Sequence, residues 1–191
     1  MAEDRAVEVA GCLLEGGADW LQLRAKGKDV QTIERVAKLL IPLCRAAGVP
    51  FILNDFPALA AELGADGVHI GQDDGSLADA RALVGPTMMI GRSTHSLEQA
   101  KAALVEGFDY IGFGPLFPTP TKQGRPGIGM QDIAAMEREV GSKIPAFCIG
   151  GIKRSNLAEV LAAGARRVVI VSDLLCAADP AAATAEVKAE L

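Results

Sequence analysis

The feature that most constrains the fold of this chain is an internal repeat in which a helix end, a glycine and an apolar strand follow one another. The unit occurs at residues 15–23 and returns at residues 63–70, 106–112 and 163–170. In each copy the glycine stands where a left-handed helix cap is expected, and a short turn leads into the apolar run. Repeated helix–strand units predict alternating β and α elements and therefore a parallel sheet.

Seven strands are predicted from this pattern, with helices between them. They centre on residues 20–24, 50–54, 67–70, 88–92, 110–114, 146–149 and 168–171. An alanine-rich last helix is expected after Asp179 and Pro180, since proline is favourable at a first helical position. Polar residues follow every strand, which favours a (β/α) barrel over an open doubly wound sheet, where they would gather at one switch point. We therefore expect an α/β fold, a TIM (β/α)8-type barrel, in a single domain over residues 1–191.

The number of predicted strands differs from that of a complete (β/α)8 barrel. The pattern opens with a helix at about residues 3–15, so eight helical segments alternate with seven strands. The chain is also shorter than the usual barrel of about 250 residues. We expect a barrel that lacks its first strand in this sequence, or one with an open seam between its first and last strands.

Composition and charge narrow the range of functions. Of the 191 residues, 50% are hydrophobic and 4% aromatic, and the net charge is −5 without a basic block. This charge argues against a nucleic-acid surface, and it requires local cations or a metal to hold an anionic ligand. No apolar run has the length of a membrane span, and the acidic amphipathic start excludes a secretory signal.

The cysteines are far apart and lie in apolar segments. We interpret them as reduced core thiols of a cytosolic protein, not as a disulfide framework or a zinc site. They are Cys12, Cys44, Cys148 and Cys176.

A stiff polar loop follows the strand at residues 110–114. It carries two hydroxyls, Thr119 and Thr121, and two cations, Lys122 and Arg125, among prolines and glycines. Prolines restrict the backbone, and hydroxyls and cations behind a buried strand suit a phosphorylated ligand. The alternative is a proline-rich connector whose charges are only solvated.

Seven motifs in this order resemble the thiamine phosphate synthases, also called thiamin-phosphate pyrophosphorylases. They are QLRAK (22–26), ND (54–55), GVHIGQDD (67–74), GRSTH (91–95), GPLFPTPTK (114–122), IGGI (149–152) and VVIVS (168–172). The resemblance covers residues 20–172 at about the family's spacing. It implies a transferase of thiamine biosynthesis, in which hydroxymethylpyrimidine pyrophosphate loses pyrophosphate and the nitrogen of thiazole phosphate traps the pyrimidine-methyl cation.

The resemblance also implies roles for single residues. The catalytic positions are Arg24, Lys26, Ser93 and Lys122, with the three cations near the pyrophosphate and the serine near the pyrimidine amino group. The substrate-binding positions are Gln22, Asn54, Thr119, Thr121, Gly151, Val171 and Ser172. Gly151, Val171 and Ser172 match the cradle of the thiazole phosphate, and barrels commonly bind phosphate with their last two loops.

Asp55 and Asp74 match the magnesium carboxylates of the family. Mg²⁺ favours one or two carboxylates together with waters and phosphate oxygens, so two aspartates from neighbouring strand ends suffice. Asp73 is the rival ligand to Asp74, and the alternative is that Asp74 only precedes the next helix.

Two other functions stay open. A thiazole tautomerase-like isomerase shares the barrel, but Pro115 stands where that branch carries a histidine. A non-catalytic phosphate-binding barrel derived from the synthase would suit the missing strand. His69 is expected to be structural, and His95 lines the pocket or caps the helix that follows. The expected partners are small-molecule substrates, with no nucleic acid and no membrane; a homo-oligomer stays open, and the expected location is cytoplasmic.

Overall fold

The computed structural model describes residues 3–118 and 126–191, and the chain forms two compact units. Unit 1 comprises Met1–Ile90 and Ala177–Ala189, and unit 2 comprises Gly91–Cys176 and Glu190–Leu191. The boundary falls inside a strand, β4 (Met89–Thr94). The prediction of a single domain over residues 1–191 stays a prediction.

Unit 1 is a parallel α/β arrangement. Its complete strands are β1 (Leu21–Leu23), β2 (Phe51–Asn54) and β3 (Gly67–Ile70). β2 pairs in parallel with both of the others. Its helices are α1 (Glu3–Glu15), α2 (Val30–Ala47), α3 (Pro57–Leu63), α4 (Leu77–Val84) and, up to Ala189, α9 (Pro180–Glu190). β2 and β3 are buried at every residue, as expected of parallel strands covered on both faces.

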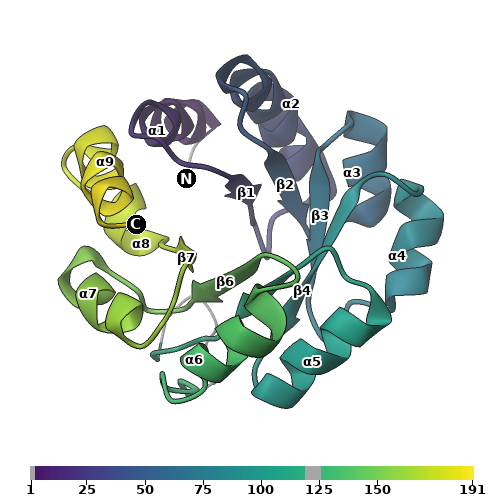
Figure 1. The fold of residues 1–191 in the computed structure, drawn as a ribbon. Helices are drawn as coiled ribbons and strands as arrows, with labels where there is room; N and C mark the ends of the chain where they lie inside the picture. The colour runs from purple at the N-terminus through teal and green to yellow at the C-terminus, as the bar shows by residue number, and fades with distance from the viewer. Residues whose placement is uncertain (1–2, 119–125) are drawn as a thin grey trace. The chain divides into compact units, whose positions relative to one another are not determined.

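Unit 2 repeats the same plan. β4 pairs with β5 (Tyr110–Phe113), β5 with β6 (Ala146–Ile149) and β6 with β7 (Val168–Val169), all in parallel. The helices are α5 (Leu97–Glu106), α6 (Ile133–Met136), α7 (Arg154–Ala162) and α8 (Ser172–Leu175), and a π-helical turn, Glu137–Gly141, continues α6. Within each unit the paired strands therefore stand in sequence order, β1 to β3 in unit 1 and β4 to β7 in unit 2, and Figure 1 labels them.

The predicted elements are confirmed. Each expected strand is present within residues 3–118 and 126–191, although β7 has two residues instead of four. The first element in this part of the chain is α1, and seven strands follow it, as expected of a barrel without its first strand. The last helix begins at Pro180, also as expected.

The repeated glycines end helices, as the sequence pattern predicts. Gly64 follows α3 with a φ of 65°, and Gly107 follows α5 with a φ of 95°. Only glycine adopts this left-handed conformation without steric cost, so each helix stops there and the chain turns into the next strand.

None of the described helices is both long and apolar enough to cross a membrane.

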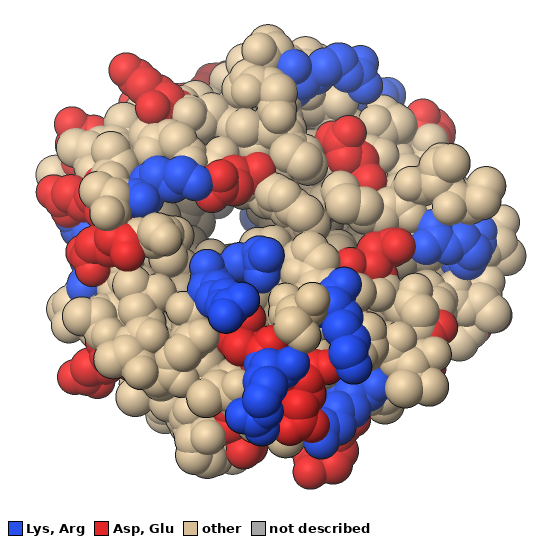
Figure 2. Space-filling view, viewed as in Figure 1, with Lys and Arg blue, Asp and Glu red and all other residues tan. Residues whose placement is uncertain are grey.

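Basic and acidic side chains are interspersed on the face of the protein shown in Figure 2. Ion pairs join such groups within each unit. In unit 1 the Lys188 Nζ lies 2.6 Å from the Asp19 Oδ1, and in unit 2 the Lys101 Nζ lies 2.5 Å from the Glu139 Oε2. Exposed pairs of this kind contribute only about 0–1 kcal/mol each to stability, so the fold rests on its apolar core.

The prediction of core thiols is correct for two cysteines and wrong for a third. All four are free; Cys44 and Cys148 are buried, but Cys176 is exposed and Cys12 partly so. Cys176 is the C-cap residue of the short helix α8, and its side chain is exposed. Burial raises the pKa of Cys44 to about 11 and that of Cys148 to about 12, so neither is a reactive thiolate at neutral pH.

Glu137 places a carboxylate in the interior of unit 2. It is 5% exposed, and its Oε1 accepts a hydrogen bond from the backbone N–H of Arg166 at 3.3 Å. Its Oε2 is buried without a hydrogen-bond partner among the described residues. Burial raises the pKa of Glu137, while the Arg166 N–H and the charge of Arg167 oppose the rise.

Replacing Glu137 by glutamine is expected to change the pH dependence of stability. Because the folded-state pKa is raised, the contribution of this group is complete below its ordinary pKa and is lost as pH rises through the raised value. The free energy of unfolding of Glu137→Gln should therefore rise relative to wild type between about pH 5 and about pH 8. Urea unfolding at both pH values measures this difference.

Glu139→Gln is the matched control. Hydrogen bonds from Lys101 and Arg138 lower the pKa of Glu139, so its contribution is present above the ordinary pKa and is lost only in more acidic solution. Its difference from wild type should stay constant over the same interval. A constant difference for Glu137→Gln as well would contradict the account of the buried carboxylate.

Candidate active site

Two aspartates and a lysine meet at the carboxyl ends of the strands in unit 1. Asp55 directly follows β2, Asp74 lies between β3 and α4, and Lys26 lies beyond β1. The Lys26 Nζ is 3.5 Å from the Asp55 Oδ2. The Asp74 Oδ2 accepts a hydrogen bond from the backbone N–H of Gly71 at 2.7 Å, which fixes the carboxylate over its own turn.

Asp55 has an unusual backbone conformation, and its carboxylate lies near a second carboxylate. Its φ is 72°, a left-handed conformation that among non-glycine residues Asn and Asp tolerate best. Its N–H donates to the His69 carbonyl at 2.9 Å, which ties this conformation to β3. Burial raises the pKa of Asp55, the opposing Lys26 charge lowers it, and the neighbouring Asp74 carboxylate raises it further. A cation between the two carboxylates would relieve this repulsion.

The donor set at this point fits Mg²⁺. Both side chains offer hard carboxylate oxygens, and Asp74, not Asp73, carries the interaction with Asp55. Within residues 3–118 and 126–191 no group of three or more His, Cys, Asp or Glu side chains could hold a metal. The remaining ligands would have to be waters and phosphate oxygens, which is the usual coordination of Mg²⁺ in phosphate-handling sites.

The other unit 1 residues singled out in the sequence lie at the same strand ends. Gln22 is exposed in β1, and Arg24 is half-buried just after it. Asn54 closes β2, is 7% exposed and stands opposite His69 in the ladder. His69 is itself buried in β3, and its structural role stays a prediction.

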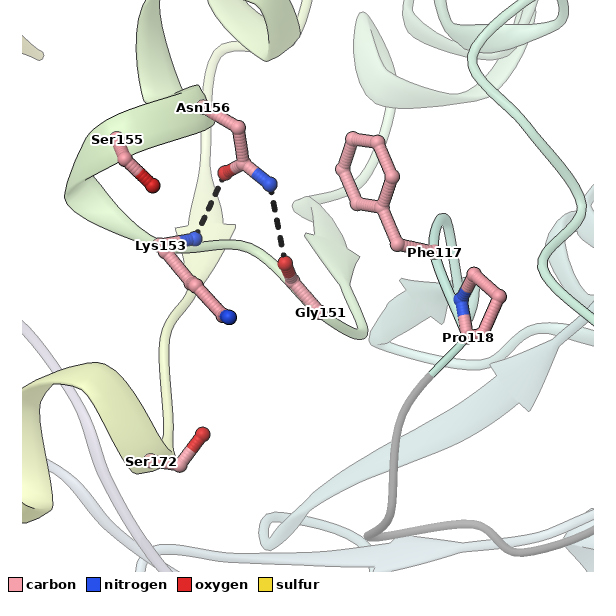
Figure 3. Close-up of a pocket in the computed structure, with 7 residues that line it drawn as sticks. All are labelled: Phe117, Pro118, Gly151, Lys153, Ser155, Asn156 and Ser172. Atoms are coloured by element: carbon pink, nitrogen blue, oxygen red, sulfur yellow. Dashed lines mark hydrogen bonds between the residues drawn. The ribbon is translucent and has the colours of Figure 1, made fainter.

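Unit 2 contains a pocket of about 380 Å³. Its described lining residues are Phe117, Pro118, Gly151, Lys153, Ser155, Asn156 and Ser172 (Figure 3). They come from the loop after β5, from the turn between β6 and α7, from the first turn of α7 itself, and from the start of α8. Of the residues predicted from the sequence, Gly151 and Ser172 are therefore brought together here, and Val171 directly precedes Ser172.

Gly151 and Asn156 determine the conformation of the turn between β6 and α7. Gly151 has a φ of 69°, and a Cβ there would lie 2.7 Å from the Cβ of Phe117. The Asn156 Nδ2 donates to the Gly151 carbonyl at 3.1 Å, and its Oδ1 accepts from the Lys153 N–H at 2.7 Å (Figure 3). Asn156 thus fixes the turn against the start of the helix, a role that was not predicted from the sequence.

An ion pair joins α7 to α8 beside the pocket. The backbone N–H and the Nε of Arg154 both donate to the Asp173 Oδ2, each at 3.0 Å. The backbone hydrogen bond lowers the pKa of Asp173 below its ordinary value, and the Arg154 side chain adds to this effect. The pair therefore links the first residues of the two helices beside the pocket and neutralises the Asp173 carboxylate.

The fourth strand and its neighbours carry Ser93 and His95. Ser93 stands opposite Gly112 in the ladder, and the preceding Arg92 stacks on the ring of Phe108 at 5.3 Å. His95 lies with its Nδ1 on the Gly114 carbonyl and does not cap α5; the Ser96 side chain does. Thr119, Thr121 and Lys122, which the sequence motifs also assign to the site, lie outside the described residues.

Comparisons with known proteins agree on one family. The family model described as thiamine monophosphate synthase matches residues 1–174. The thiamine-phosphate synthase of Thermus thermophilus is 48% identical over 167 residues, covering 87% of this chain and 80% of the relative. That of Acidothermus cellulolyticus is 43% identical over 180 residues, covering 94% and 84%.

A solved structure supports the same conclusion. The thiamine phosphate pyrophosphorylase of Pyrococcus furiosus superimposes with a TM-score of 0.86 at 34% identity, over 96% of this chain and 87% of that one. The expected TIM-barrel-type fold is confirmed by this likeness.

Proposed function

Because the chain belongs to the thiamine-phosphate synthase family of thiamine biosynthesis, we propose that it joins hydroxymethylpyrimidine pyrophosphate to thiazole phosphate and releases pyrophosphate. The observation that carries this proposal is the pair Asp55 and Asp74, held together beside Lys26. Carboxylates and a cation in this arrangement suit a magnesium-bound diphosphate. The separate pocket around Gly151 and Ser172 suits a second phosphate.

The reaction is a substitution at the methylene carbon of the pyrimidine. The bond from this carbon to the pyrophosphate oxygen breaks, and its electron pair leaves with the pyrophosphate. The lone pair of the thiazole nitrogen then forms the new carbon–nitrogen bond. No proton is gained or lost, so the protein needs no activated nucleophile, in accord with the raised pKa of Cys148, about 12.

The residues that the sequence motifs assign to the pyrophosphate would stabilise the leaving group. Asp55 and Asp74 would hold Mg²⁺, which when bound neutralises charge that develops on the pyrophosphate. Arg24 can bind phosphate oxygens in two-pronged fashion, whereas Lys26 and Lys122 act as point charges. The amides of Gln22 and Asn54 and the hydroxyl of Ser93 would orient the pyrimidine and its pyrophosphate.

In unit 2 the chain would bind the thiazole phosphate. The turn at Gly151 lets a phosphate approach backbone N–H groups, and Val171 and Ser172 offer further donors. The hydroxyls of Thr119 and Thr121 would complete the ligand-lining loop. We further propose a cytoplasmic location, which the free thiols suit. Self-association stays a prediction that light scattering on the purified protein can test.

An assay with both substrates and Mg²⁺ tests the proposed function. Separation of the products by ion exchange should give thiamine phosphate and pyrophosphate in equal amounts. Conversion of the thiazole substrate to an isomer without pyrophosphate release would favour the tautomerase-like alternative. Binding of both substrates without turnover would favour the non-catalytic barrel.

A further inference from the structure

We propose that Lys153 binds the phosphate of the thiazole substrate and makes the pocket prefer the phosphorylated thiazole to its unphosphorylated alcohol. This inference rests on the proposed function and assigns a binding residue to it. Of the described residues that line the pocket, Lys153 alone carries a charge. In the view of Figure 3 its side chain extends toward the space between Gly151 and Ser172.

The charges around the pocket leave Lys153 available to a ligand. The neighbouring cation, Arg154, is engaged twice by Asp173 at 3.0 Å. This pairing is the main reason for the lowered pKa of Asp173, and the charge of Lys153 contributes least to it. The acidic group is thus neutralised by Arg154, while the charge of Lys153 faces the pocket.

The backbone of Lys153 is fixed while its side chain is free to adapt. Its N–H donates to the Asn156 Oδ1 at 2.7 Å, and the residue directly precedes α7. A lysine on a flexible stem acts as a point charge that can follow a phosphate into place. Asn156 therefore fixes the backbone position of Lys153, and the position of the ammonium group adjusts to the bound ligand.

The rest of the pocket matches a thiazole phosphate in its polarity. Ser155 and Ser172 add hydroxyl groups, and Phe117 and Pro118 form an apolar side. A phosphate dianion bound to a chain with a net charge of −5 needs a local cation, and Lys153 supplies it. The apolar side suits the flat thiazole ring.

Steady-state kinetics of Lys153→Gln with both thiazoles tests the proposal. The KM for thiazole phosphate should rise about tenfold or more, since a hydrogen bond to a charged group is lost. The KM for the pyrimidine pyrophosphate and the reaction of the thiazole alcohol should stay near wild type. Lys153→Arg should restore most of the affinity, and Lys143→Gln, an exposed lysine of the same unit outside this pocket, should change nothing.

Two results would overturn the proposal. One is an unchanged KM for thiazole phosphate in Lys153→Gln, and the other is an equal loss with phosphate and alcohol. If the wild-type protein forms no thiamine phosphate, the proposed function is wrong. Titration calorimetry can then still test whether Lys153 binds the phosphate group. Wild type should then bind thiazole phosphate more tightly than inorganic phosphate, and Lys153→Gln should weaken both; equal affinities, or no weakening, would refute the assignment.

Discussion

Asp55→Asn is expected to lower kcat/KM for the pyrimidine pyrophosphate by about 100-fold or more, because it removes a carboxylate from the proposed leaving-group site. Asparagine is the most conservative replacement, since it also tolerates the φ of 72° found at this residue. The backbone should therefore stay in place while the charge is lost. Kinetics at several Mg²⁺ concentrations, together with the melting temperature, separate lost chemistry from lost stability.

The two acids after β3 provide the control for this prediction. Asp74→Asn should resemble Asp55→Asn, because the two side chains interact. Asp73→Asn changes the adjacent exposed acid and should retain nearly wild-type activity. Wild-type rates in both Asp55→Asn and Asp74→Asn would show that these carboxylates do not handle the pyrophosphate.

Gly150→Ala is expected to destabilise the protein by about 2–5 kcal/mol and to weaken binding of the thiazole phosphate. Gly150 has a φ of 98°, and a Cβ there would lie 2.4 Å from the Cα of Pro115. Its carbonyl also accepts the Phe117 N–H at 3.0 Å, so a shift of this turn would move the loop that lines the pocket. Urea unfolding and the KM for thiazole phosphate measure the two effects.

Gly164→Ala separates the cost of the backbone conformation from the cost of the steric clash. Gly164 has a similar φ of 107°, but a Cβ there would meet no atom closer than 3.4 Å. The free energy of unfolding of this variant should fall only by the cost of the left-handed backbone, about 1–2 kcal/mol, and its substrate affinity should not change. Equal destabilisation by both substitutions would mean that the close approach to Pro115 is relieved at no cost.

The order of the elements was predictable because two local signals agree. Glycines such as Gly64 and Gly107 end helices for a steric reason that is independent of tertiary context. Buried parallel strands are apolar along their whole length, so β2 and β3 stand out in the sequence. The π-helical turn Glu137–Gly141 was not predicted, since π-helical turns are rare and continue an α-helix without a spacing signal of their own.

The candidate site was predictable as a set of residue types but not as a set of contacts. The motifs point to Asp55, Asp74 and Gly151, but neither the left-handed backbone of Asp55 nor its interaction with Asp74 has a sequence signal. Lys153 and Asn156 were missed because a helix start looks like an ordinary solvated segment. Only the fold reveals that this helix start lines a pocket.

The most direct measurement of the central claim is ³¹P nuclear magnetic resonance of the protein with both substrates. With Mg²⁺, signals of thiamine phosphate and pyrophosphate should rise together in equal amounts while those of the substrates fall. Addition of a chelator in excess over Mg²⁺ should stop both. Release of inorganic phosphate or pyrophosphate without thiamine phosphate, or intact substrate signals in the presence of Mg²⁺, would contradict the account.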